Sequence, residues 1–226
     1  MDTPVLIVGG GPVGLPLAVE LGWRGVECTL IEQSDGTIAT PKMQEVNTRT
    51  MEFCRRWGMA EQVMNCPFPD DMPMDVVVVT RFGAHELGRI ERPARRMQRP
   101  NPHSPMNLQV CSQQWFDPML RQRAQGFPGV RLLYQHRLDA FAADDAGVTA
   151  TVADLATGQS KQIRARYLVG ADGASSNVRR KLDIGLEGSE TLSHSMHVFF
   201  KAPDLYGQFG VKPGTFFSAI DKDGYW

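Results

Sequence analysis

The fold is decided by residues 4–32, which read PVLIVGGGPVGLPLAVELGWRGVECTLIE. Residues 4–8 form a short apolar run that ends in consecutive glycines, a pattern typical of a buried parallel strand entering a tight turn. Apolar residues then recur every four positions from Val13 to Leu21, which indicates one face of a helix. A second apolar run covers residues 27–31. The stretch therefore predicts strand, glycine turn, helix and strand, which together make a βαβ unit.

Residues 9–14 read Gly-Gly-Gly-Pro-Val-Gly and satisfy the pattern G-x-G-x-x-G. We expect Gly9 to permit the tight turn, Gly11 to let the backbone approach a pyrophosphate, and Gly14 to let helix and strand pack closely. The start of the helix would then offer free N–H groups and the positive end of its dipole to the phosphates. The segment is predicted to bind a dinucleotide.

Glu32 follows the second apolar run, at the position where such units carry an acid. Its carboxylate is expected to accept both hydroxyl hydrogens of an adenosine ribose. An acid at this place disfavours a 2′-phosphate, so NADP is not expected in this loop. The alternative is a structural glycine turn followed by a surface glutamate. The unit alone does not distinguish NAD from FAD.

Composition excludes several classes of function. The 226 residues include 24 Lys and Arg and 25 Asp and Glu, which gives a formal net charge of −1. This balance predicts neither nucleic acid nor membrane as a partner. The four cysteines form no C-x-x-C pair, which favours reduced thiols. The five histidines show no metal-ligand spacing, and the sequence shows neither a signal peptide nor ~20 consecutive apolar residues. We expect a cytoplasmic globular protein without a metal site.

The rest of the chain alternates helices and strands. A helix is expected over residues 112–125, with Trp115 and Met119 buried and with Phe116 and Leu120 as further candidates for its buried face. The other predicted elements are a helix over residues 47–57 and strands over residues 75–80, 130–134, 138–142, 148–152 and 163–169.

A second motif identifies the dinucleotide through a resemblance. Residues 167–179 read YLVGADGASSNVR, an apolar strand that delivers Asp172 to its carboxyl end, followed by Gly173 and by Ser175 or Ser176 as a helix cap. This stretch resembles the Asp-Gly motif of the aromatic-ring flavoprotein hydroxylases, the family of phenol hydroxylase and para-hydroxybenzoate hydroxylase. The alternative is a strand, turn and capped helix without a ligand.

Two further stretches resemble the same family. Residues 41–52 read PKMQEVNTRTME, and the resemblance implies that Lys42 lies beside the FAD pyrophosphate. The helix that begins near Ser112 resembles a family helix whose glutamine, here Gln113, hydrogen-bonds the ribityl chain of the flavin. Leu138 falls where the family's backbone meets the adenine.

Taken together, the phosphate loop and the resemblance predict twelve cofactor-binding residues. They are Gly9, Gly11, Pro12, Val13, Gly14, Glu32, Gln33, Lys42, Met43, Gln113, Leu138 and Asp172. No catalytic residue is assigned, because in the family the flavin performs the chemistry while the protein positions the substrate and excludes water.

The resemblance implies an α/β fold in which a Rossmann-like FAD-binding domain with a mixed sheet is joined to the beginning of a β-rich substrate domain. The FAD-binding domain is expected at residues 1–72 and 107–185, and the partial substrate domain at residues 73–106 and 186–226. Residues 194–201 and 215–220 are expected to start the sheet of the substrate domain. The family's Gly-Asp motif does not occur after residue 185, so we expect an N-terminal fragment that is inactive alone.

The implied activity is that of an FAD-dependent monooxygenase. In the family, NADPH or NADH reduces FAD, O2 adds to the reduced flavin, and the C4a-hydroperoxide hydroxylates an aromatic substrate, either phenol-like or polycyclic. A homo-oligomer is left open. The alternatives are another FAD-dependent oxidoreductase, such as an epoxidase, a halogenase-like enzyme or an oxidase, and a non-catalytic flavin-binding module.

Overall fold

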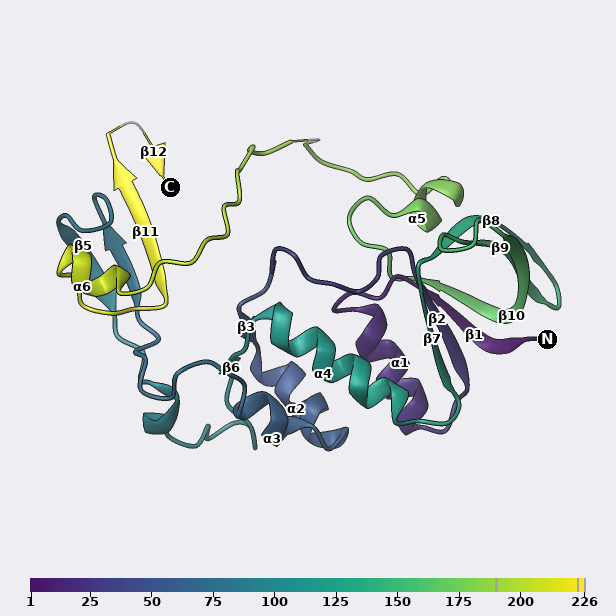
Figure 1. Cartoon of the computed structure of the whole chain (residues 1–226), viewed down its shortest axis with the longest axis horizontal. Helices are drawn as coiled ribbons and strands as arrows, with labels where there is room; N and C mark the ends of the chain where they lie inside the picture. The colour runs from purple at the N-terminus through teal and green to yellow at the C-terminus, as the bar shows by residue number, and fades with distance from the viewer. Residues whose placement is uncertain (190, 223, 226) are drawn as a thin grey trace.

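The computed structural model describes residues 1–189, 191–222 and 224–225. Its larger sheet has six strands in the order β7-β2-β1-β10-β9-β8 and occupies one end of the molecule (Figure 1). In chain order these strands are β1 (Thr3–Val8), β2 (Cys28–Glu32), β7 (Val130–Tyr134), β8 (His136–Asp144), β9 (Gly147–Asp154) and β10 (Ser160–Gly170). Parallel pairing joins β7, β2, β1 and β10, whereas β10, β9 and β8 pair antiparallel. The predicted mixed sheet is confirmed.

Strand β1 lies in the middle of this sheet and is buried on both faces. Side chains alternate along it, so Ile7 joins one cluster of buried residues while Leu6 and Val8 join another. Helix α1 (Gly14–Trp23) connects β1 to β2, and this confirms the predicted βαβ unit. Burial on both faces explains why the strand reads as an unbroken apolar run.

Helices cover one face of the sheet. Helix α4 (Gln113–Gln125) packs beside α1, while α2 (Thr48–Arg56) and α3 (Ala60–Met64) lie next to α4 (Figure 1). On α4, Phe116 and Leu120 are fully buried, whereas Trp115 and Met119 are only partly buried. The predicted buried face is therefore confirmed with its weighting reversed: Phe116 and Leu120 lie in the core, and Trp115 and Met119 pack against its edge. Helix α3 was not predicted.

The antiparallel strands cover the other face. Leu138 of β8, Val152 of β9 and Ile163 of β10 share one buried cluster with Ile31 of β2. The sheet therefore curls over itself and brings the start of β8 across the carboxyl end of β2. This curl forms one side of the cavity described below.

The second sheet has four strands in the order β12-β11-β4-β5 and stands at the opposite end of the molecule (Figure 1). Its strands are β4 (Val76–Val79), β5 (Glu86–Ile90), β11 (Phe216–Asp221) and β12 (Gly224–Tyr225), and helix α6 (Leu205–Phe209) lies beside them. Strand β11 confirms the strand expected at residues 215–220. The strand expected at residues 194–201 is wrong, because in the described chain this segment has no neighbouring strand to supply its hydrogen bonds.

A short ribbon and small helical turns complete the fold. Strands β3 (Glu45–Val46) and β6 (Gln109–Val110) pair antiparallel between the two sheets. The remaining elements are η1 (Arg95–Met97) and α5 (Asn177–Lys181). Among the described residues no helix is long and apolar enough to cross a membrane, and no group of three His, Cys, Asp or Glu side chains is arranged to hold a metal ion.

A buried ion pair holds the second sheet together. Arg89 on β5 donates a hydrogen bond of 2.8 Å to Asp75, and the two side chains are only 7% and 5% exposed. Arg89 also donates to the carbonyl of Pro213, just before β11. Burial alone would raise the pKa of Asp75, but hydrogen bonds from the Arg92 N–H and from Arg89 hold it below its usual value. The pair thus joins three segments that are distant in sequence.

We expect Arg89→Met to lower the free energy of opening of strands β4 and β5 by about 3 kcal/mol, because it leaves the Asp75 carboxylate buried without its partner. Hydrogen exchange of the amides in β4 and β5 measures this opening. The matched control is Lys212→Met, since Lys212 pairs with Glu91 on the surface at 3.4 Å and is expected to contribute little. Equal exchange in the two variants would contradict the role of the buried pair.

Candidate functional site

The glycine loop after β1 is shaped by contacts that exclude side chains. Gly9 has φ +110°, and a Cβ atom there would collide with the carbonyl of Ala171 at the end of β10. A Cβ atom on Gly14 would collide with the carbonyl of Gly9. Gly11 has open space on its Cβ side, with nothing within 4 Å. The first and third glycines therefore allow close packing, and the second keeps the approach to the backbone clear.

Helix α1 begins at this loop without a side-chain cap. Its N-cap residue is Val13, which makes no capping hydrogen bond, and no acidic residue lies in the first turn. The first N–H groups of a helix have no partner within the helix. In α1 the Leu15 N–H donates to the Gly11 carbonyl and Pro16 has no N–H. The N–H groups of Val13 and Gly14 are therefore the ones left for an acceptor from outside the described residues, and the helix dipole favours an anion at this end.

Glu32 lies at the carboxyl end of β2, directly across from the glycine loop. One carboxylate oxygen accepts the Gly10 N–H at 2.7 Å, and the other accepts the Ser34 N–H at 2.7 Å. Each oxygen retains a second lone pair. The carboxylate is thus held in one orientation and can still accept hydrogen bonds from a ligand.

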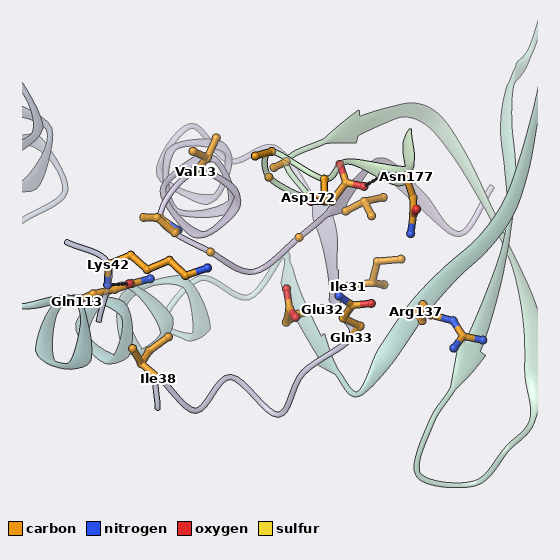
Figure 2. Close-up of a pocket in the computed structure, with 18 of the residues that line it drawn as sticks. Val13, Ile31, Glu32, Gln33, Ile38, Lys42, Gln113, Arg137, Asp172 and Asn177 are labelled. Carbon is orange, nitrogen blue, oxygen red and sulfur yellow. Dashed lines mark hydrogen bonds between the residues drawn. The ribbon is translucent and has the colours of Figure 1, made fainter. Parts of the chain in front are cut away.

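These elements border a cavity of about 720 Å³. It is enclosed by the glycine loop, the end of β2 with the loop after it, the start of α4, the start of β8 and the turn after β10 (Figure 2). Of the twelve predicted cofactor residues only Gly14 does not line the cavity. The glycine loop, Gln113 and Asp172 are up to more than 100 residues apart in the chain, and they meet at this one cavity. The resemblance to one family predicted that they would share a cofactor.

Along the cavity, the predicted residues lie in a definite order. In the view of Figure 2, Arg137 next to Leu138 lies at one end, Glu32 lies in the middle, and Lys42 and Gln113 lie at the other end. The Lys42 side chain extends into the cavity (Figure 2). Its backbone N–H donates to Gln113 Oε1 at 2.9 Å, so the loop carrying Lys42 is attached to the start of α4.

Asp172 both lines the cavity and organises the turn after β10. Its carboxylate accepts hydrogen bonds from the Ser176 hydroxyl and from the N–H groups of Asn177 (2.7 Å) and Val178 (3.1 Å). Ser176 in turn caps α5 by accepting the Arg179 N–H. Burial alone would raise the pKa of Asp172, but these hydrogen bonds hold it below its usual value. Asp172 therefore does two things at once: it lines the cavity and it stabilises the capped turn before α5.

Sequence reasoning missed several residues of the cavity wall. They are Thr37, Ile38, Ala39 and Thr40 in the loop after β2, His136 and Arg137 at the start of β8, and Asn177 at the start of α5. His136 Nδ1 lies 2.7 Å from the Tyr134 carbonyl, and Arg137 donates to Asp139 at 2.7 Å. Asn177 lies inside the motif at residues 167–179 but was not singled out there. The others belong to no motif with fixed spacing, and only the curl of the sheet brings β8 to the cavity.

Comparisons with known proteins identify the family. The model of a family described as an FAD binding domain matches residues 2–215. Tetracenomycin A2 monooxygenase-dioxygenase of Streptomyces glaucescens is 36% identical over an alignment of 219 residues that covers 89% of this chain and 38% of that protein. The 2,4-dichlorophenol 6-monooxygenase of Cupriavidus pinatubonensis (strain JMP 134 / LMG 1197) is 30% identical over 223 residues, 97% of this chain and 37% of that protein.

A solved structure agrees with these relatives. The rebeccamycin biosynthetic enzyme RebC with reduced flavin superposes with a TM-score of 0.86 at 37% identity, over 97% of this chain and 42% of that one. The chain therefore belongs to the family of FAD-binding domains, and its cofactor is FAD. The resemblance to flavoprotein hydroxylases is confirmed. The chain spans about two fifths of the length of the relatives that it matches.

The cavity fits FAD on two observations. The N–H groups of Val13 and Gly14 at the start of α1 offer donors for a pyrophosphate, and the residues that line the cavity include Leu138 on one side and Gln113 on the other. The oriented carboxylate of Glu32 lies between these ends, where it could accept the hydroxyl hydrogens of a ribose next to that pyrophosphate. A dinucleotide requires donors for its pyrophosphate and an acceptor for its ribose in this order along one cavity.

We expect Glu32→Ala to weaken FAD binding by about one to three orders of magnitude, because two ribose hydroxyls would lose a charged acceptor. Fluorescence titration of the protein with FAD measures the dissociation constant. Glu32→Gln keeps one acceptor oxygen and is expected to lie between the wild type and Glu32→Ala. The control is Glu61→Ala, which removes an exposed acid from α3. Unchanged affinity in Glu32→Ala would make Glu32 a surface acid.

We expect Asp172→Ala to weaken FAD retention about tenfold or more while lowering stability by only about 1–2 kcal/mol, the usual cost of a lost helix cap. The reason is that its carboxylate holds the whole turn that forms this wall of the cavity. Ser176→Ala removes only one of the three donors to Asp172 together with the cap of α5. It should therefore lose similar stability but keep most of the FAD affinity. Thermal melts and FAD titrations of both variants decide, and equal FAD affinities would contradict the assignment.

Proposed function

We propose that FAD lies in the cavity with its adenine beside Leu138, its adenosine ribose hydroxyls on Glu32, its pyrophosphate at the start of α1 and its ribityl chain at Gln113. The order of these residues along the cavity supports this placement. Lys42 adds a positive charge beside the phosphates, and Gly14 acts through packing alone. The remaining contacts are assigned to Gly9, Gly11, Pro12, Val13, Gln33, Met43 and Asp172.

We also propose that the two sheets belong to two domains. Residues 1–72 and 107–185 would form the FAD-binding domain, and residues 73–106 and 186–226 part of a substrate domain. The division is supported by the strands themselves, since the six-stranded sheet draws every strand from the first pair of ranges and the four-stranded sheet from the second. In this division, residues 73–106 leave the FAD-binding domain and join the second sheet before the chain returns to the FAD-binding domain at residue 107.

We infer that the protein is an NAD(P)H-using monooxygenase that hydroxylates an aromatic ring. The observation that carries this inference is the joining of the phosphate loop, Gln113 and the Asp172 turn around one cavity in a chain of this family. Bound FAD supplies the redox chemistry by taking electrons from NADPH or NADH and, once reduced, reacting with O2. The residues of this chain hold the cofactor, orient it and limit the access of water.

The substrate class that the relatives favour is polycyclic. Tetracenomycin A2 monooxygenase-dioxygenase (36%) and RebC (37%) share more identity with this chain than the dichlorophenol monooxygenase (30%) does. We therefore propose a fused-ring aromatic compound as the substrate and a single-ring phenol as the alternative. Both present an electron-rich ring, so the same cofactor chemistry serves either.

We expect the full-length protein with FAD to oxidise NADPH or NADH at least about tenfold faster when a fused-ring phenol is added, and to incorporate one oxygen atom from ¹⁸O₂ into it. Mass spectrometry of the product, with a peroxide assay beside it, measures both outcomes. Peroxide formed in equal amount to the NAD(P)H consumed, without a labelled product, would indicate an oxidase instead. Bound FAD that no NAD(P)H reduces would indicate a non-catalytic flavin-binding module.

A further inference from the structure

One buried face of α4 is polar. Gln113, Asp117 and Arg121 follow one another at intervals of four residues, so they project from the same side of the helix. Gln113 is 7% exposed and Asp117 only 2%. The Arg121 guanidinium lies 4.2 Å from the centre of the Tyr134 ring on β7. Apolar side chains would satisfy the packing at these positions, so the polar groups require another explanation.

The Gln113 amide is fixed in one orientation by two partners. Its Oε1 accepts the Lys42 N–H at 2.9 Å, and its Nε2 donates to Asp117 Oδ2 at 2.9 Å. An ionised Asp117 carboxylate has no hydrogen to donate, so a Gln113 amide flipped by 180° would place two acceptor oxygens together. Asp117 therefore determines which end of the amide meets Lys42 and leaves one Nε2 hydrogen free.

Burying the Asp117 carboxylate at this position costs free energy. Its second oxygen, Oδ1, is buried without a hydrogen-bond partner among the described residues, as are Arg121 Nε and the Tyr134 hydroxyl. Burial raises the pKa of Asp117. A buried polar atom without a partner costs free energy. The cluster therefore does not exist for stability, and such costs concentrate at functional sites.

The same helix face also holds the other end of the loop that forms the cavity wall. Arg121 donates to the Gly36 carbonyl at 2.7 Å, and a Cβ atom on Gly36 would collide with the Arg121 guanidinium. Residues 37–40 and Lys42, which line the cavity, lie between this anchor and the Gln113 anchor. The polar face of α4 thus sets the position of the loop at both ends.

We propose that Asp117 is a positioning residue of the flavin site, which orients the Gln113 amide and, through it, the loop that carries Lys42. This proposal rests on the placement of FAD proposed above. Asp117 does not line the cavity itself, so it acts through Gln113. Its removal should loosen cofactor binding without harming the fold.

The test compares Asp117→Leu, which removes the acceptor, with Asp117→Asn, whose side-chain oxygen still accepts from Gln113 Nε2. We expect Asp117→Leu to bind FAD about 5- to 30-fold more weakly, the loss of roughly one oriented hydrogen bond. Asp117→Asn should stay within about threefold of the wild type. Without FAD, Asp117→Leu should melt close to the wild-type temperature, because the removal of the unpartnered Oδ1 offsets the acceptor that Gln113 Nε2 loses.

Two further readouts separate positioning from a general structural role. In the FAD-free protein, hydrogen exchange of the Lys42 amide should be about tenfold faster in Asp117→Leu than in Asp117→Asn. The double variant Gln113→Leu/Asp117→Leu should bind FAD no more weakly than Gln113→Leu alone, because residues that act through one contact are not additive.

Additive losses in the double variant, a large fall in melting temperature of Asp117→Leu, or unchanged Lys42 exchange would each overturn the role of Asp117. The proposed function fails in a different way, namely if the wild-type protein binds no FAD. In that case the Lys42 exchange still decides whether Asp117 orients Gln113.

Discussion

The close contact of three backbone segments at the carboxyl end of β1 is the constraint on which the rest of the site depends. The Gly9 N–H donates to the Ile31 carbonyl on β2, and the Ala171 N–H donates to the Val8 carbonyl. At the same point Gly9 approaches the carbonyl of Ala171 so closely that no side chain fits. Since β1 pairs with both β2 and β10, Glu32 and Asp172 are brought to either side of the glycine loop. A larger residue at Gly9 would separate all three.

The cavity therefore combines two kinds of support. At the glycine loop the geometry comes from backbone packing, which needs no polar side chain beyond Glu32. On the opposite wall the loop after β2 contributes no helix or strand between Gln33 and Gln44, and it is positioned by side chains of α4 instead. An irregular loop held at both ends keeps its shape only as long as its anchors do, which explains why the anchors are buried.

Local patterns in the sequence predicted the elements whose contacts are close along the chain. The βαβ unit and the capped turn at Ser176 follow from spacing, glycine and cap chemistry within about thirty residues. On α4 the sequence predicted the four apolar residues of the buried face but favoured Trp115 and Met119, which pack at the edge of the core, over the fully buried Phe116 and Leu120. Which apolar residues of a helix face the core depends on the neighbouring elements, here α1 and β7, and these are not visible in the helix itself.

The same reasoning could not predict which strands and side chains pair across long distances in the sequence. Strand β11 pairs with β4 across more than 100 residues, and the Asp75–Arg89 pair that secures them has no signature in the sequence. The apolar run at residues 194–201 had the composition of a strand but lacks a neighbour among the described residues. For the site, eleven of the twelve predicted residues line one cavity, but the sequence did not predict Arg137 of β8 in its wall or the hydrogen bond of Asp117 on α4 to Gln113.

The central claim is that this cavity holds FAD, with Glu32 at the adenosine ribose and the start of α1 at the pyrophosphate. A crystal structure of the protein soaked or grown with FAD tests it directly. We expect the two ribose hydroxyls within about 3 Å of the Glu32 carboxylate and a phosphate oxygen at hydrogen-bonding distance from the first N–H groups of α1. FAD bound elsewhere, or bound here with its ribose turned away from Glu32, would contradict the account.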